Sequence, residues 1–194
     1  MLVVSDIHGN LPYLKGLLHK LRLSEEDILF ILGDFTEKGS QSLDTLRYIM
    51  ALGEKYTLHT LCGNCDIWAP LLDGEIGRGG ETVLEYMGRK PYSLARQMCR
   101  ELGLEFSPDM DYDSLRRAIF ENYGPEMDFL RSLPTLIETE DYVFVHGGVP
   151  EKKGDAWDYM KYDCFMHKAG PQKKCFFRQM PFKIYYNKKI IKLQ

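Results

Sequence analysis

Residues 28–39 have the sequence ILFILGDFTEKG, in which a short apolar run ends in glycine, an acid and a polar loop. A second apolar run, at 2–4, leads in the same way to Asp6 and His8. A third strand is predicted at 57–61, and it leads to a glycine and an asparagine. Continuous apolar runs of this length are typical of strands that are covered on both faces. Because ligands collect beyond the carboxyl ends of parallel strands, the pattern predicts an α/β fold with its site at the strand ends.

Helical patterns separate these strands. Asn10 is a candidate N-cap for a helix over residues 11–21, and Ser40 is a candidate N-cap for a second helix. The first third of the chain therefore predicts the order strand-helix-strand-helix-strand and a parallel sheet. Two later strands are expected at 135–138 and 142–145.

The middle of the chain has only helical patterns, from residue 67 to about residue 134. No linker sets this region off, so we interpret it as a helical insertion within a single domain that spans residues 1–194. Residues 171–194 differ from the rest of the chain, because they contain seven basic and no acidic residues. We interpret them as an atypical basic tail. The helices of the insertion are expected near 82–87, 92–102, 112–122 and 125–133.

The composition is that of an ordinary globular domain, with 44% hydrophobic and 27% charged residues and a net charge of -3. This charge gives no reason to expect a nucleic-acid partner, and no apolar run is long enough to span a membrane. The first residues already read as a buried strand rather than a signal peptide, and the five cysteines are irregularly spaced. Both features favour a reducing, cytoplasmic location.

The side chains that follow the strands form a chemically consistent set. They comprise the carboxylates of Asp6 and Asp34, the imidazoles of His8 and His146, and the amide of Asn64. Such mixed oxygen and nitrogen ligands favour Mn, Fe or Zn. In an extended segment Asp6 and His8 would point to the same side and serve one ion, and Asp34 is able to bridge two. Two ions roughly 3.5–4 Å apart can activate a hydroxide and hold phosphate oxygens, so the set predicts a two-metal phosphoesterase site.

Four short motifs carry a resemblance to a known family: Asp6-Ile7-His8-Gly9, Gly33 to Gly39, Gly63-Asn64-Cys65-Asp66 and His146-Gly147-Gly148. The chain resembles the calcineurin-like metallophosphoesterase superfamily, in the branch of the Ser/Thr protein phosphatases and bacterial diadenosine-tetraphosphatase-like enzymes. The resemblance implies a four-layer α/β/β/α sandwich, with two packed β-sheets flanked by helices. It also implies that Asp6, His8 and Asp34 bind one ion and that Asp34, Asn64 and His146 bind the other.

Cys65 departs from the family pattern, which usually has a histidine at this position. That histidine protonates the leaving group and is steadied by the acid that follows it, here Asp66. The resemblance thus assigns Asp34, Asn64, Cys65 and Asp66 to catalysis, and Lys38 and Asn64 to the substrate phosphate. A cysteine, with a reference pKa of about 8.5, is a poorer proton donor, and family members with cysteine here resemble phosphodiesterases. A small buried thiol without a chemical function is the alternative.

The basic tail bears on the second ion. The family has a histidine there that completes the second metal site, and Gln179 falls where it belongs. Because an amide binds these metals less well than imidazole, we expect the second site to be weak. The C-terminus is interpreted as truncated, divergent or frame-altered, which would leave a sheet edge open.

Three functions are compatible with these observations. The first is a metal-dependent phosphoesterase most like a Ser/Thr protein phosphatase, whose partner is a phosphorylated substrate, either a phosphoprotein or a small phosphoester. The second is a phosphodiesterase or nucleotide hydrolase, which Cys65 favours. The third is a catalytically impaired module that binds phosphate, which Cys65 and Gln179 favour together.

Overall fold

The computed structural model describes residues 1–68, 72, 83–90, 92–107 and 109–148, and the backbone of three strands at 174–176, 183–186 and 189–192. Gln179 lies outside these residues, so its predicted place at the second metal remains a prediction. Among the described helices, none is long and apolar enough to cross a membrane.

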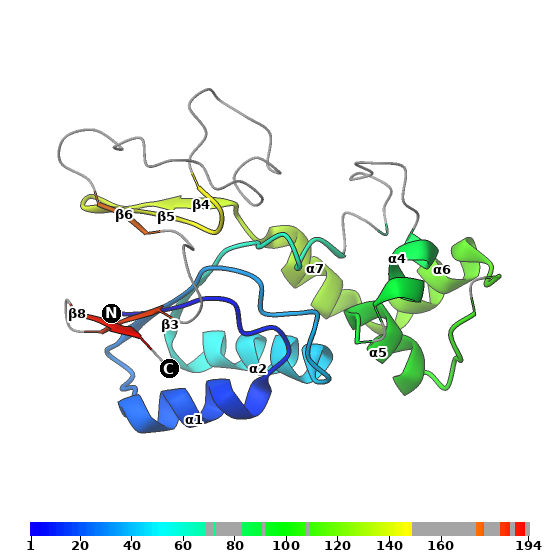
Figure 1. Cartoon of the computed structure of the whole chain (residues 1–194), viewed down its shortest axis with the longest axis horizontal. Helices are drawn as coiled ribbons and strands as arrows, with labels where there is room; N and C mark the ends of the chain where they lie inside the picture. Colours follow the sequence, from blue (N-terminus) through cyan, green and yellow to red (C-terminus); the bar gives the residue numbers. More distant parts are fainter. Residues whose placement is uncertain are drawn as a thin grey trace.

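The larger sheet begins with three parallel strands, β1 (Leu2–Val4), β2 (Ile28–Ile31) and β3 (Thr57–Thr60). They are connected by α1 (Leu11–Leu21) and α2 (Ser42–Lys55), which lie together on one face of the sheet (Figure 1). The strand-helix-strand-helix-strand order expected from the sequence is therefore confirmed. The apolar faces of both helices are buried against the sheet; they include Leu14, Leu18, Leu46 and Ile49.

A smaller sheet packs on the other face of the larger one. It contains β4 (Leu136–Glu138), which is antiparallel to β5 (Tyr142–Val145), and β6 (Lys174–Phe176), which is parallel to β5. The rings of Phe30 in β2 and Phe144 in β5 stack with centroids 3.9 Å apart. Three layers of the expected sandwich are thus present, two sheets and one layer of helices. The helical layer expected outside the smaller sheet is not among the described residues.

Two strands from the basic tail extend the larger sheet. β7 (Lys183–Tyr186) is antiparallel to β1, and β8 (Lys189–Lys192) is antiparallel to β7. The strand order is β3-β2-β1-β7-β8. The sequence predicted that an open sheet edge would remain because the last strands of the family are missing. β7 and β8 extend the sheet beyond β1, and among the described strands β8 forms the edge on that side.

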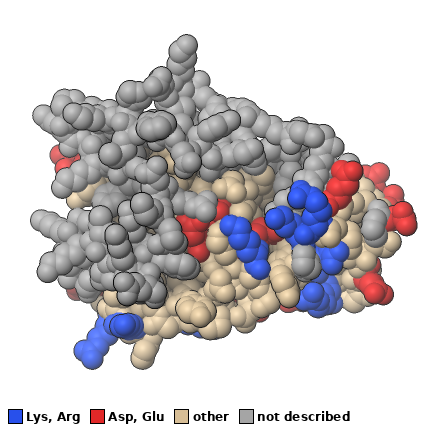
Figure 2. All heavy atoms as spheres, viewed as in Figure 1, with Lys and Arg blue, Asp and Glu red and all other residues tan. Residues whose placement is uncertain are grey.

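Four described helices form the insertion, close to the ranges expected from the sequence. α4 (Val83–Arg89), α5 (Leu94–Glu101) and α6 (Tyr112–Asn122) project to one side of the sheets, and α7 (Gly124–Ser132) leads back to β4 (Figure 1). Their buried side chains belong to the same hydrophobic cluster as those of α1 and α2. Basic and acidic side chains intermingle on the visible face of the insertion (Figure 2).

Both predicted helix caps differ from the structure. Asn10 occupies the N-cap position of α1, but its side chain donates hydrogen bonds to the carbonyls of Ile7 and His8, at 3.1 and 3.3 Å, instead of capping the helix. α2 begins after Gln41 and not after Ser40. In both cases the loops before the helices are held by contacts at the strand ends, which outweigh local capping preference.

Candidate active site

The loops that follow β1 and β2 lie side by side and continue the pairing of these strands. The amide of Asp6 donates to Gly33, that of His8 donates to Asp34, and that of Gly9 donates to Phe35, at 3.1, 2.9 and 2.8 Å. This backbone pairing places the side chains of both loops at one edge of the sheet.

Asp6, His8 and Asp34 share an unusual backbone conformation, with φ values of 59°, 48° and 53°. The sequence predicted an extended segment at Asp6 and His8, and this is wrong. The left-handed conformation costs roughly 1–2 kcal/mol for a residue other than glycine. The conformation persists because the hydrogen bonds between the two loops impose it, as is typical of functional sites.

Asp66 holds the loops together. It is completely buried, and its Oδ2 accepts hydrogen bonds from the amides of Asp34 and Gly63 at 2.6 and 3.0 Å. Its Oδ1 accepts from the amide and the hydroxyl of Thr36 at 3.0 and 2.8 Å. Burial and the nearby Asp34 carboxylate raise the pKa of Asp66 to about 6. These four hydrogen bonds give Asp66 a part in holding the loops together; the catalytic part that the sequence suggested stays a prediction.

Gly63 lets the third loop approach the second. A Cβ at Gly63 would overlap the amide and the carboxylate of Asp34. The absence of a side chain at this position therefore permits Asn64 and Cys65 to lie beside Asp34.

The carboxylate of Asp34 is completely buried between two imidazoles. Its Oδ1 lies 3.3 Å from Nε2 of His146, and its Oδ2 lies 3.7 Å from Nε2 of His8. Nε2 of His8 also lies 3.5 Å from Oδ1 of Asp6. The two oxygens of Asp34 thus face two different groups of side chains, as a carboxylate that bridges two ions would require.

Each imidazole is oriented by a backbone carbonyl. Nδ1 of His146 lies 2.6 Å from the carbonyl oxygen of Leu32, and Nδ1 of His8 lies 3.3 Å from that of Thr36. A proton on Nδ1 that is donated to these carbonyls leaves the lone pair of Nε2 for a metal ion. Nε2 of His146 is buried without a hydrogen-bond partner among the described residues. Because a buried polar atom without a partner is costly, this atom fits the metal site that the sequence predicts.

The charges of the site also suit a cation. Burial alone would raise the pKa of Asp34, but His146, the amide of Cys65 and His8 together lower it well below its usual value. Burial would lower the pKa of His146, but Asp34 and the Leu32 carbonyl raise it. At 3.3 Å the contact between Nε2 of His146 and Oδ1 of Asp34 is longer than a well-formed hydrogen bond.

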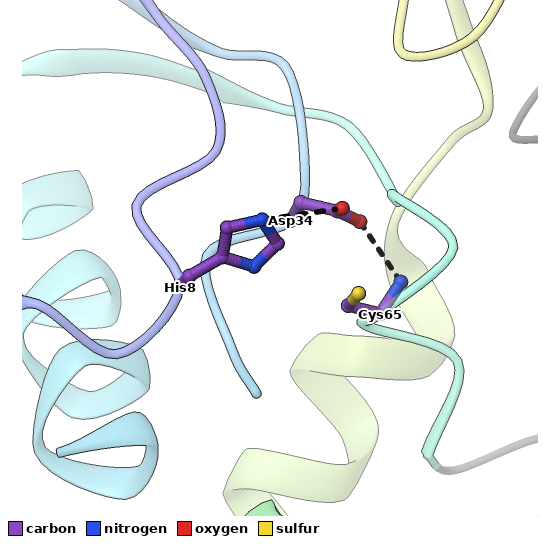
Figure 3. A group of neighbouring side chains, drawn as sticks. All are labelled: His8, Asp34 and Cys65. Carbon is purple, nitrogen blue, oxygen red and sulfur yellow. Dashed lines mark hydrogen bonds and ion pairs between the residues drawn. The ribbon is translucent and has the colours of Figure 1, made fainter. Parts of the chain in front are cut away.

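Cys65 lies on the other side of Asp34 from His8 (Figure 3). Its amide donates to Oδ1 of Asp34 at 2.9 Å, and the amide nitrogen of the Asn64 side chain lies 3.5 Å from its sulfur. Burial, followed by the charges of Asp34 and Asp66, raises the pKa of the Cys65 thiol. The donor atoms of His8, Asp34 and Cys65 lie within 4.8 Å of one another, so the sulfur belongs to the same cluster.

Lys38 lies at the entrance of this cluster. Its Nζ is 2.8 Å from Nε2 of His8, and its side chain is exposed. His8 cannot offer the same lone pair to Lys38 and to a metal ion, so an ion bound to His8 would displace the ammonium toward an anion beside the ligands. The phosphate contact suggested by the sequence stays a prediction.

Sequence reasoning did not single out Glu37, the residue before Lys38. Glu37 is 1% exposed, and its Oε1 accepts hydrogen bonds from the indole of Trp68 and the amide of Leu94, at 2.6 and 2.7 Å. The neighbouring residues in the sequence are the same whether an acid in such a loop is exposed or buried. The sequence therefore could not predict the partners of Glu37.

The fold and the side chains at its strand ends are those of a metallophosphoesterase. The chain belongs to the calcineurin-like phosphoesterase family, whose model matches residues 1–183.

Several known proteins are similar to this chain. A symmetrical bis(5'-nucleosyl)-tetraphosphatase of Pseudomonas syringae is 37% identical over 142 residues, which make up 71% of this chain and 46% of that protein. The protein of the same name from Hamiltonella defensa is 39% identical over 66 residues, or 34% of this chain and 23% of that protein. The chain therefore spans less than half the length of these relatives. A metallophosphoesterase structure from Sphaerobacter thermophilus has a TM-score of 0.45 at 22% identity, covering 76% of this chain and 46% of that one.

Proposed function

We propose that this chain is a metal-dependent hydrolase of nucleoside polyphosphates, acting on phosphoric anhydride bonds. One observation carries the metal-dependent part of the proposal. The buried carboxylate of Asp34 faces His146 with one oxygen and His8 with the other. The amide of Cys65 donates to one of these oxygens, and the Nε2 atoms of the two imidazoles lie 3.3 and 3.7 Å from the carboxylate, an arrangement that suits shared metal ligands.

We propose the two ligand sets that the family resemblance implies. Asp6, His8 and Asp34 would hold one divalent ion, and Asp34, Asn64 and His146 would hold the other. Mn, Fe and Zn suit these ligand types. When bound, such ions polarise phosphate oxygens and lower the pKa of a bound water.

The chain's own residues would place the substrate. Lys38 and Asn64 lie on different loops beside the ligands, where each can donate hydrogen bonds to a phosphate oxygen. Asp66 keeps the loops in register through its four hydrogen bonds and does not meet the substrate.

Cys65 supports an anhydride as the bond that is cleaved. A buried thiol flanked by carboxylates is a poor proton donor, and an alkoxide leaving group needs one. A phosphate leaving group does not, because its second pKa is about 6. The relatives named as bis(5'-nucleosyl)-tetraphosphatases favour the same substrate class. We therefore propose a small nucleotide as the substrate, in place of the phosphoprotein that the sequence favoured.

The test compares two substrates on one preparation. The purified chain is supplied with Mn²⁺ and given either diadenosine tetraphosphate or a phosphoserine peptide, and the products are separated by chromatography. We expect hydrolysis of the first at a rate far above that of the second, and loss of both after chelation. Faster hydrolysis of the peptide would refute the proposal. Binding of metal and phosphate without hydrolysis of either substrate would favour the impaired phosphate-binding module instead.

A further inference from the structure

Glu37 and Lys38 are two consecutive residues in the left-handed conformation, with φ values of 65° and 62°. Neither is a glycine, so each carries a conformational cost of roughly 1–2 kcal/mol. Two such residues in sequence persist only where surrounding contacts impose the conformation. The contacts that impose it come from the helical insertion.

Glu37 provides the first of these contacts. Its buried Oε1 accepts from the amide of Leu94, the first residue of α5, and from the indole nitrogen of Trp68. A carboxylate at a helix N-terminus is stabilised by the helix dipole and by charge-assisted hydrogen bonds. The loop residue before Lys38 is thereby anchored to α5.

Gln97 provides the second contact, one turn further along α5. Its Nε2 donates to the carbonyl of Gly39 at 3.3 Å and to that of Tyr92 at 3.0 Å. Its Oε1 accepts from the amide of Leu43 at 3.0 Å, near the start of α2. The side chain is nearly buried, at 7% exposure. The residue after Lys38 is thus held by the same helix as the residue before it.

These two contacts decide where the ammonium of Lys38 can reach. A lysine side chain has four rotatable bonds and is not held by its own packing when it is exposed. Fixing the backbone on both sides keeps the side chain beside the ligand group, where its Nζ lies 2.8 Å from Nε2 of His8. An ion bound to His8 would displace the ammonium from this nitrogen and leave it for a phosphate oxygen.

We propose that α5 of the insertion positions Lys38 for the substrate phosphate, with Glu37 and Gln97 as the positioning residues. This inference rests on the proposed function insofar as Lys38 binds phosphate. The insertion then has a function besides packing, because it carries polar groups that fix the conformation of the loop around Lys38.

The first experiment is a double-mutant cycle read by calorimetry of orthophosphate binding to the Mn²⁺-loaded chain. Glu37→Leu and Gln97→Leu remove the two anchors, and each is made alone and together with Lys38→Ala. Each single variant should weaken phosphate binding by about tenfold, within the range for coupled contacts. In the Lys38→Ala background the same substitutions should have little further effect. Glu37→Gln keeps an oxygen acceptor and should retain most of the binding.

Glu126→Leu is the matched control. It also removes a nearly buried carboxylate of the insertion, one that accepts from Nε of Arg47 at 2.8 Å and has no contact with the loop around Lys38 among the described residues. It should leave phosphate binding unchanged. A loss of binding in this variant as large as that in Glu37→Leu would show that the effect is general destabilisation and would overturn the inference.

A second readout does not depend on phosphate. Acylation of lysines by acetic anhydride, mapped by mass spectrometry, reports how firmly the ammonium of Lys38 is held, with Lys15 on α1 as an exposed internal reference. Lys38 should react several-fold faster in Glu37→Leu and Gln97→Leu than in the wild type. If this holds but the wild type binds no phosphate, the proposed function fails and the positioning of Lys38 stands. Unchanged acylation, or equal losses of phosphate binding with and without Lys38, would overturn the inference.

Discussion

Replacing Asp66 by asparagine tests the structural function that the geometry assigns to this residue. Each of the two carboxylate oxygens of Asp66 accepts two hydrogen bonds. An asparagine can keep its oxygen toward the amides of Asp34 and Gly63 only if its amino group faces Thr36. The hydroxyl of Thr36 can then turn to accept a hydrogen bond, but the amide of Thr36 is left without an acceptor.

The size of the effect follows from these contacts. One buried amide without a partner costs about 1–3 kcal/mol, and the remaining bonds lose their charge-assisted strength, about 1 kcal/mol each. The removal of the repulsion between Asp66 and Asp34 offsets part of this loss. We therefore expect the free energy of unfolding to fall by about 2 kcal/mol, which for a chain of this length lowers Tm by about 4–8 °C.

The assay is thermal unfolding of the metal-free chain, followed by circular dichroism. Asp128→Asn is the control, because the Asp128 carboxylate is 77% exposed and pairs with Arg131 on the surface at 3.3 Å. Such a pair contributes about 0–1 kcal/mol, so the control should unfold close to the wild type. An Asp66→Asn variant that unfolds within the error of the wild type would show that the four hydrogen bonds do not hold the loops.

Three further predictions concern the metals and the leaving group. Asp34→Asn should release both ions and abolish turnover, because the shared anionic ligand is lost; two ions found by elemental analysis of this variant would contradict the bridging arrangement. Calorimetry with Mn²⁺ should show a strong site and a weak site, since the sequence predicts Gln179 where the family has an imidazole at the second; two equally tight sites would refute this. Cys65→His should speed hydrolysis of an alkyl phosphate relative to an activated aryl phosphate, and by up to about 10²-fold if a proton donor is restored. An unchanged ratio of the two rates would mean that proton transfer at this position does not limit the reaction.

The ordering of strands and helices could be predicted from the sequence because it depends on local patterns. The helices at Leu11–Leu21 and Tyr112–Asn122 and the strand at Tyr142–Val145 have the predicted bounds. Apolar residues recur there at helical spacing or in a short continuous run, and such periodicity requires no knowledge of distant residues. The predicted ligands were recognised for the same reason, since each follows directly after an apolar strand.

Tertiary structure alone decided what several of these residues do. Asp66 meets Thr36 across 30 positions of the chain, and Glu37 meets Leu94 across 57. The left-handed backbone at Asp6 and His8 likewise depends on pairing with the loop after β2. Acidic residues of these loops differ in their contacts: Asp34 is a proposed metal ligand, Asp66 accepts hydrogen bonds from two loops, and Glu37 accepts from the first amide of α5. The sequence alone determined which chemical groups stand at the strand ends, and the long-range contacts decided which of them face the metal site, because a side chain's direction depends on the segments that pack against it.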